Sequence, residues 1–448
     1  MQQLTARTMW LFALGQLGWA LLVGLIANWL VYVYQPDQTV IDAGQTVFIP
    51  QGLAVLGIIT VVGAITAFSR IFDAVTDPWI ANLSDRSRNP RGRRIPFMKV
   101  AAIPLAISTC LVFYAPVSTT SHWNSIWLLV MLLLFYLFLT LYVTPYNALI
   151  PELGKTKQDR VNISTCISLT FIIGTSIAFF APIIWGMFEP TFGRVTAIQL
   201  TFAGMSLLAL ICLLIPVFTI HERHFISSKP SEGALFSSLI NTFRNRNFAI
   251  FVRSDILYWI ALTMFQTGLP FFVVALLGLE ESMTALLFVL MTALSLLFYI
   301  PINRLAGKLG KKRLVLLAFF LFSFVYVITG IGGWFGISGI VYGIVIAVFA
   351  SVPIAILGIL PQAMVADLAH IDAIDTGENR EGMFFAARTF AFKLGQSLAL
   401  LLFTALATID PASGTGYRLA AFSAAILCFI GALALLAYQE KEMNQRLE

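Results

Sequence analysis

Three charged residues interrupt an otherwise apolar stretch of this chain: Arg70, Asp73 and Asp77. Their spacing of three and four residues places them on one face of an α-helix. Carboxylates bind protons, and they are also preferred ligands of small, hard cations. Pro78 has no N–H to donate to the carbonyl of Ala74, so this carbonyl is expected to offer another oxygen beside them. The pattern favours a cation or proton site, with a purely structural ion network as the alternative.

The helix that carries these charges is predicted to cross a membrane. Of the 448 residues, 59% are hydrophobic and only 11% are charged, whereas a soluble domain carries about 25% charged residues. Long apolar runs predict membrane helices, because every backbone amide in lipid must be paired internally. We expect twelve spans, at residues 8–34, 51–84, 95–116, 124–150, 161–187, 197–220, 247–277, 283–305, 314–332, 336–364, 382–409 and 416–438. Charges at this depth should face the interior of the bundle.

Basic residues are concentrated in alternate loops, at residues 86–99, 155–160, 223–246 and 304–313. Because Lys and Arg collect on the cytoplasmic side of a membrane, both termini are predicted to be cytoplasmic. The net charge of +6 then reflects topology, and we expect no nucleic-acid partner. The sequence is typical of a multi-pass protein of the bacterial inner membrane. We expect the protein to be surrounded by lipid and to be monomeric.

An internal repeat divides the chain into halves. The loop that begins at Asp85-Arg86 aligns without a gap with the loop that begins at Asn303-Arg304, at an offset of 218 residues. We therefore predict an all-α polytopic fold of two pseudo-symmetric six-helix bundles, with a substrate site between them. The predicted parts are bundles at 1–222 and 247–440, a cytoplasmic linker at 223–246 and a tail at 441–448. The offset aligns Asp73 and Asp77 with Met291 and Ser295, so the acidic pair belongs to the first half alone.

Further charges lie in or near the other spans. A buried lysine needs a counter-charge, so Lys393 is expected to pair with Asp73 or Asp77 across the bundle. Arg388 has two interpretations, a ligand contact or part of a collar with the charged residues at 378–381. We expect Asp255 to form a solvated local pair with Arg253. A second collar is predicted to act as a cytoplasmic gate, formed by Asp85, Arg86, Arg93, Arg94 and Arg304.

The segment from Arg70 to Pro78 resembles the helix-2 motif of the glycoside–pentoside–hexuronide:cation symporters, a melibiose-permease-like family of the major facilitator superfamily. Residues 145–153 are similar to the end of that family's helix 4, and residues 366–393 to its loop 10–11 and helix 11. The resemblance implies the major facilitator fold and cation-coupled symport by alternating access.

The resemblance also implies roles for individual residues. Asp73, Asp77 and Thr140 would bind the coupling cation, Na⁺ or H⁺, with Lys393 and Arg70 as charge partners. The implied substrate contacts are Tyr146, Asn147, Arg388, Thr389 and Gln396. We expect no metal site and no cofactor beyond the coupling ion.

Several positions depart from the family pattern. Acidic residues that bind sugar in helices 1 and 4 of melibiose-type members are replaced by Ala20 and Val143, and Arg388 replaces a glutamine. The cation half of the site is thus retained, and a gained arginine favours an anionic substrate such as a uronide or another organic acid. An amphiphile such as a lysophospholipid is an alternative cargo. A non-transporting receptor or a membrane enzyme is disfavoured, because no sensory domain and no nucleophile–base pair is evident.

Overall fold

The structure, a computed structural model, is built from α-helices. It describes residues 5–42, 44–87, 89, 92–154, 157–220, 222, 242–376 and 381–440. Most of the predicted linker 223–246 and the whole tail 441–448 lie outside the described residues. The chain divides into two compact units: unit 1 is Met1–Val55 with Ala64–Gly233, and unit 2 is Leu56–Gly63 with Ala234–Glu448.

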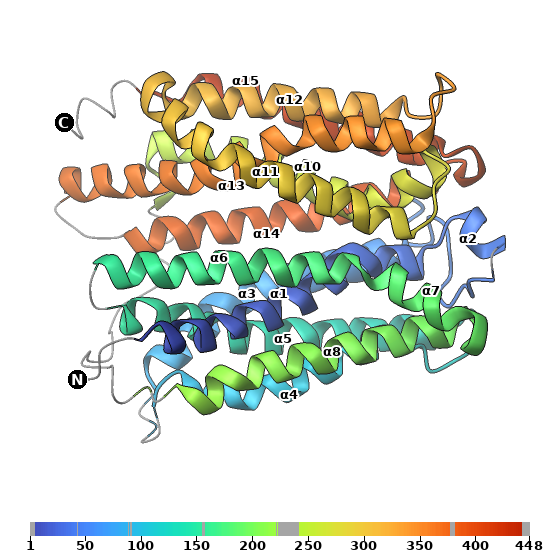
Figure 1. Ribbon diagram of the computed structural model, residues 1–448, viewed down its shortest axis with the longest axis horizontal. Helices are drawn as coiled ribbons and strands as arrows, with labels where there is room; N and C mark the ends of the chain where they lie inside the picture. The colour runs from blue at the N-terminus through green and yellow to red at the C-terminus, as the bar shows by residue number, and fades with distance from the viewer. Residues whose placement is uncertain are drawn as a thin grey trace. The chain divides into compact units, whose positions relative to one another are not determined.

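Unit 1 holds the first six predicted spans (Figure 1). Its helices are α1 (Ala6–Tyr34), α2 (Gln38–Asp42), α3 (Val61–Asp85, from residue 64 onward), α4 (Ile95–Val112), α5 (His122–Leu153), α6 (Lys157–Phe179), α7 (Ala181–Phe192) and α8 (Arg194–Thr219). Helix α1 packs against α6 and α8, and α4 packs against α5 and α8. Helices α6 and α7 together form the fifth span, with a break at Phe180.

Unit 2 holds the other six spans. Its elements are α10 (Arg246–Phe271), the π-helix η2 (Phe272–Leu276), α11 (Ser282–Leu309), α12 (Lys311–Gly330), α13 (Gly339–Thr376), α14 (Glu381–Leu406), the 3₁₀ turn η3 (Pro411–Ser413) and α15 (Thr415–Leu436). Helix α10 packs against α14 and α15, while α13 packs against α11 and α12.

Two predicted boundaries are wrong. The second span was expected from residue 51, but α3 begins at Val61. Leu56 and two glycines, Gly52 and Gly57, have positive φ angles and cannot continue a right-handed helix. The tenth span was expected to end at 364, but α13 continues to Thr376. Beyond Pro361 the helix still has an apolar side, on which Met364, Val365 and Leu368 are all buried.

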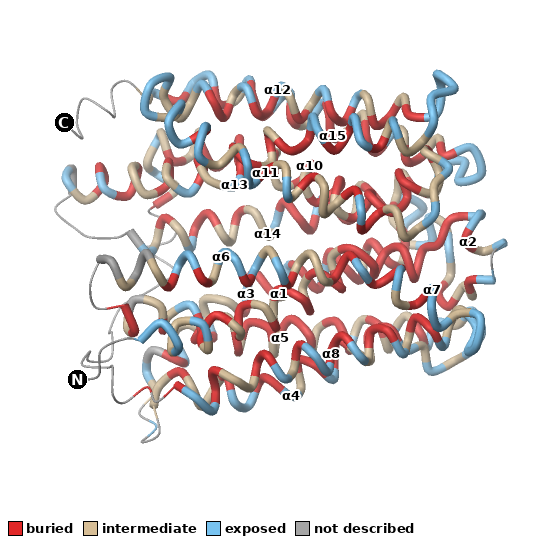
Figure 2. Tube along the Cα trace, in the orientation of Figure 1, coloured by how far each residue is buried: buried red, intermediate tan, exposed pale blue. Residues whose placement is uncertain are grey.

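The helices have the length and composition of membrane spans. Eleven stretches of helix among the described residues are long and apolar enough to cross a bilayer. Helix α3 is the twelfth, and three charges at Arg70, Asp73 and Asp77 lower its hydropathy. Figure 2 shows buried and exposed positions alternating along most helices. Many exposed positions are large and apolar, for example Leu297 and Ile300, as expected for a surface in contact with lipid.

Candidate cation site

Two carboxylates and a hydroxyl meet in unit 1. The Oγ1 atom of Thr140, on α5, lies 3.0 Å from Oδ1 of Asp73 and 3.0 Å from Oδ1 of Asp77, both on α3. Asp73 is 1% exposed and Thr140 is 2% exposed, while Asp77 is half-buried. The site predicted for the cation therefore has its three residues in contact within one unit.

The hydroxyl of Thr140 cannot donate to both carboxylates at once. A hydroxyl carries a single hydrogen, and an ionised carboxylate only accepts. When both aspartates are ionised, Thr140 can donate to one of them at a time, although both contacts are 3.0 Å long. A proton on one carboxyl group, or a cation bound among the oxygens, would satisfy the arrangement. The geometry can thus bind a small positive species.

Arg70 supplies a resident positive charge at the edge of this site. Its Nη1 atom lies 3.7 Å from Oδ2 of Asp73, which is an ion pair longer than a direct hydrogen bond. The guanidinium also lies over the ring of Tyr136 on α5, 5.0 Å from the ring centroid. This cation–π contact helps to hold Arg70 beside Asp73. Arg70 is thus an ion-pair partner of Asp73, and its role in coupling stays a prediction.

The backbone of α3 contributes a further feature. Pro78 lies inside α3, one residue after Asp77. It cannot donate to the carbonyl of Ala74, a fully buried residue next to Asp73. Thr76 donates from its hydroxyl to the carbonyl of Asp73, 3.1 Å away. The helix therefore offers polar backbone oxygens beside the carboxylates.

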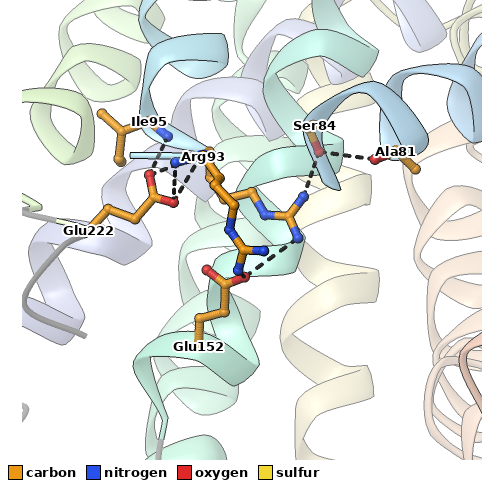
Figure 3. Close-up of polar contacts among 7 residues, drawn as sticks. Ala81, Ser84, Arg93, Ile95, Glu152 and Glu222 are labelled. Carbon is orange, nitrogen blue, oxygen red and sulfur yellow. Dashed lines mark hydrogen bonds and ion pairs between the residues drawn. The ribbon is translucent and has the colours of Figure 1, made fainter. Parts of the chain in front are cut away.

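A second polar group, here named the basic-loop network, lies at the start of α4 (Figure 3). Glu222 is 2% exposed, and its carboxylate accepts hydrogen bonds from the backbone N–H groups of Arg93, Arg94 and Ile95, at 2.6–3.0 Å. This carboxylate caps the positive end of the helix. Both arginines also pair with Glu152, at 3.3 and 3.5 Å. Burial raises the pKa of the Glu152 carboxyl, and the two nearby guanidinium groups oppose this shift.

Unit 2 repeats this network. Glu440 accepts from the backbone N–H groups of Lys311 and Lys312, at 2.5 and 3.1 Å. The ammonium of Lys311 pairs with Asp367. Glu222 and Glu440 are separated by the same 218 residues as the two loops, so the predicted repeat is confirmed by equivalent contacts.

Replacing Glu222 by Gln is expected to lower the free energy of unfolding by about 1–3 kcal/mol, because a charged acceptor is lost from three backbone N–H groups that are buried or partly buried. Glu440→Gln should have a similar effect in unit 2. Glu189, whose side chain is 32% exposed and pairs with Arg194, is the matched control, and Glu189→Gln should cost less than about 1 kcal/mol. Thermal denaturation of the purified protein in detergent measures all three. Equal effects for Glu222 and Glu189 would contradict the capping role.

Arg388 and Asp255 form a buried ion pair in unit 2, which corrects two predictions. Nε and Nη2 of Arg388 donate to the two carboxylate oxygens of Asp255, at 2.7 and 2.9 Å. The side chains are only 5% and 3% exposed. Asp255 is therefore not in a solvated pair with Arg253, which is exposed. Arg388 does not act as an unbalanced positive charge, because two parallel hydrogen bonds neutralise it.

The remaining predicted ligand contacts have different environments. Tyr146 is fully buried; its hydroxyl donates to the carbonyl of Phe12 at 2.9 Å, and the two rings stack at 4.3 Å. Tyr146 is thus a packing residue between α1 and α5, which corrects its prediction as a ligand contact. Asn147 is exposed and Thr389 is half-buried, while Gln396 is 9% exposed. These three assignments stay predictions.

Other predicted roles are only partly visible. Lys393 is half-buried on α14 of unit 2, and its pairing with Asp73 or Asp77 stays a prediction. In the predicted gate, Arg93 and Arg94 make the contacts given above, whereas Arg86 and Arg304 are exposed. The side chain of Asp85 lies outside the described residues, as do residues 378–380 and the side chain of Glu381 in the alternative Arg388 collar.

Three structural partners were missed from the sequence: Glu222, Tyr136 and the pairing of Asp255 with Arg388. Glu222 had a signal, since the offset of 218 residues that aligns the basic loops also aligns Glu222 with Glu440. Asp255 and Arg388 are 133 residues apart in separate spans. Their pairing depends on the register between α10 and α14, for which a single sequence carries no signal.

Among the described residues, eleven apolar stretches of membrane-span length and α3, which carries an acidic pair, are divided between two units. This arrangement is typical of a secondary transporter of the major facilitator type. The family model described as MFS/sugar transport protein matches residues 11–438. The chain therefore belongs to this family and is a multi-pass membrane symporter, a transporter that moves a small molecule together with a coupling ion.

Individual relatives agree with this assignment. An uncharacterized symporter of Synechocystis sp. (strain ATCC 27184 / PCC 6803 / Kazusa) is 25% identical, over 76% of this chain and 77% of the relative. The isoprimeverose transporter of Lactiplantibacillus pentosus is 23% identical over 58% of this chain and 54% of its own length. The solved D-xylose–proton symporter has a TM-score of 0.70 at 14% identity, over 97% and 98% of the two chains. At this identity the solved structure shows the fold alone.

Proposed function

We propose that this symporter couples the movement of one monovalent cation, Na⁺ or H⁺, to the uptake of an uncharged glycoside. The proposal rests on one observation: three oxygens of Asp73, Asp77 and Thr140 lie at 3.0 Å contacts that share a single hydroxyl hydrogen. Two carboxylates in a membrane helix are costly unless a positive species compensates them. Arg70 compensates Asp73 in part, at 3.7 Å.

Coupling follows from this charge balance. A proton or Na⁺ bound among these oxygens offsets the negative charge of the two carboxylates. The hydroxyl of Thr140 then donates to the oxygen that remains. If the conformation that binds substrate tightly is also the neutralised one, each ligand raises the affinity for the other by the same factor. Alternating access of the two units would then carry both ligands together.

An uncharged substrate is favoured over an anion. The case for an anion depended on Arg388 as a gained positive charge, and Asp255 balances this charge with two hydrogen bonds. The related isoprimeverose transporter is named for a sugar, which agrees with a neutral, hydroxyl-rich cargo. The basic loops support an orientation with both termini in the cytoplasm.

Uptake into proteoliposomes tests the proposal. The probes are isoprimeverose, D-xylose, and D-glucose paired with D-glucuronate, which share a ring and differ in charge. Lysophosphatidylcholine represents an amphiphilic cargo. Each is offered with an inward Na⁺ gradient, an inward H⁺ gradient, or neither.

We expect at least one neutral sugar to accumulate with one of the two gradients and only equilibrate without it. D-Glucuronate should not be preferred over D-glucose. Accumulation that responds to neither gradient would contradict symport, and ion-driven uptake restricted to glucuronate or the lysolipid would contradict a neutral glycoside.

A further inference from the structure

Helices α10 and α14 of unit 2 run parallel in a fixed register. Asp255 pairs with Arg388, and four residues further along each helix the ring of Trp259 stacks on Phe392 with centroids 4.5 Å apart. Both contacts join residues 133 apart. Further along, Phe271 contacts Phe403, at 5.6 Å between centroids. Contacts that advance together along both helices define a parallel pair.

The next level of this register holds two polar residues. One helical turn beyond Trp259 and Phe392 are Thr263 on α10 and Gln396 on α14. The helices approach closely just before this level, because a Cβ atom added at Gly395 would lie 3.2 Å from the Ile256 carbonyl oxygen. Thr263 is 7% exposed and Gln396 is 9% exposed. Both residues are therefore buried, and they lie on two helices that pack against each other.

Polar atoms at these two levels lack hydrogen-bond partners. Within the described part of the chain, Nε1 of Trp259, Oγ1 of Thr263 and Oε1 of Gln396 are buried and form no hydrogen bond. Buried polar side chains are nearly always satisfied, and each exception calls for a missing water, ion or ligand. Three exceptions on facing helices, within one turn, point to one absent species.

The chemistry of the three atoms identifies its class. Indole Nε1–H donates, the amide oxygen accepts, and the hydroxyl can do both. None carries a charge, and the charged pair one turn before Trp259 is internally neutral. An uncharged group that both accepts and donates hydrogen bonds matches these three atoms. Sugar hydroxyls have this property, and an ion does not.

We propose that Trp259, Thr263 and Gln396 form a sugar-hydroxyl subsite in unit 2, filled by the transported glycoside. The subsite rests on the proposed function, because it gives the neutral substrate a place separate from the cation. It lies in unit 2, whereas Asp73, Asp77 and Thr140 lie in unit 1. The cation and the sugar would thus be held mainly by different units.

Conservative variants separate this subsite from the cation site. Trp259→Phe keeps an aromatic ring against Phe392 and removes the donor. Thr263→Val keeps the shape and removes the hydroxyl, and Gln396→Met keeps the length and removes the amide. Thr329→Val is the matched control, because the hydroxyl of this buried threonine already donates to the carbonyl of Val325 at 2.8 Å. Each variant is assayed with the neutral sugar that the parent accumulates best among D-xylose, isoprimeverose and D-glucose.

Each subsite variant should raise the apparent KM for that sugar about tenfold, which corresponds to one lost neutral hydrogen bond. The cation concentration for half-maximal stimulation should change less than about twofold. Thr329→Val should leave both values near those of the parent. Forms of the sugar that lack one hydroxyl group give a second test. We expect the parent to bind one of these deoxy sugars about tenfold more weakly than the full sugar. The variant that lacks the partner of that hydroxyl should bind the deoxy sugar no more weakly than it binds the full sugar.

Three other results would each contradict the subsite in a different way. If the subsite variants keep the parent KM and only their thermal stability changes, the buried atoms serve packing or an ordered water, and the subsite is wrong while symport stands. If KM and cation dependence worsen together in all variants including Thr329→Val, general structural damage explains them and the subsite is also wrong. If the parent binds and accumulates no sugar, the proposed function fails, and the subsite fails with it.

Discussion

Replacing Asp77 by Asn is expected to reduce cation-driven accumulation of substrate about 100-fold, with the protein still folded and inserted. The variant removes one charged acceptor from the group formed with Asp73 and Thr140, and a charge-assisted contact contributes up to about 3 kcal/mol, equivalent to about 100-fold in affinity. Asp77 is less buried than Asp73, so its loss disturbs folding less. Asp73→Asn should abolish coupling as well, and it should also lower stability because Arg70 loses its counter-charge.

Matched variants distinguish loss of the ion from general damage. Ser295 occupies the position that the internal repeat aligns with Asp77, and its hydroxyl is already bonded within α11. Ser295→Ala should accumulate substrate like the parent. Thr140→Ser keeps the hydroxyl and should retain most coupling, whereas Thr140→Val should lose it. Proteoliposome uptake under the productive ion gradient measures all of these, and parent-like accumulation by Asp77→Asn would refute the assignment.

Asp255→Asn is expected to destabilise the protein strongly, by about 3–5 kcal/mol, because it leaves the guanidinium of Arg388 buried without a counter-charge. Arg388→Gln should have a comparable effect through the unpaired carboxylate. Thermal denaturation of the purified variants measures both effects, and Arg253→Gln is the control, since Arg253 is exposed on the same helix.

The double variant Asp255→Asn with Arg388→Gln tests whether the pair acts as a neutral unit. Since no net charge remains buried, we expect most of the lost stability to return, together with ion-driven uptake of the neutral sugar. A double variant as unstable as the sum of the single variants would show that each residue has a separate partner. A stable double variant without uptake would instead show that the pair contacts the cargo directly.

The sequence was sufficient to predict the spans, the repeat and the group formed by Asp73, Asp77 and Thr140. Helical spacing fixes which side of α3 the carboxylates share, and the family motif added Thr140 from a second helix. Predictions failed where the outcome depends on backbone conformation, or on the register between helices that are far apart in the sequence. Leu56 has a left-handed backbone conformation, so α3 begins only after it. Hydropathy carries no information about such a conformation.

Register between helices explains the remaining errors. Neither interpretation of Arg388 included Asp255, which lies in another span, 133 residues away. Tyr146 was expected at a ligand, but its ring stacks on Phe12 of α1. The rotation of one helix against another is set by packing of many side chains, which a single sequence does not reveal. For the same reason Thr263 and Gln396 are recognisable as neighbours only in the structure.

The cation site is tested most directly by ion-dependent thermal stability of the purified protein, without any substrate. Na⁺ is titrated at constant pH and ionic strength, and pH is titrated in the absence of Na⁺. A ligand that binds the folded state stabilises it by about 2.7 kcal/mol at 100 times its Kd. We predict a saturable rise in melting temperature for the parent and for Ser295→Ala in one of the two titrations, and none for Asp77→Asn. A response of Asp77→Asn equal to that of the parent would contradict cation binding at Asp73, Asp77 and Thr140.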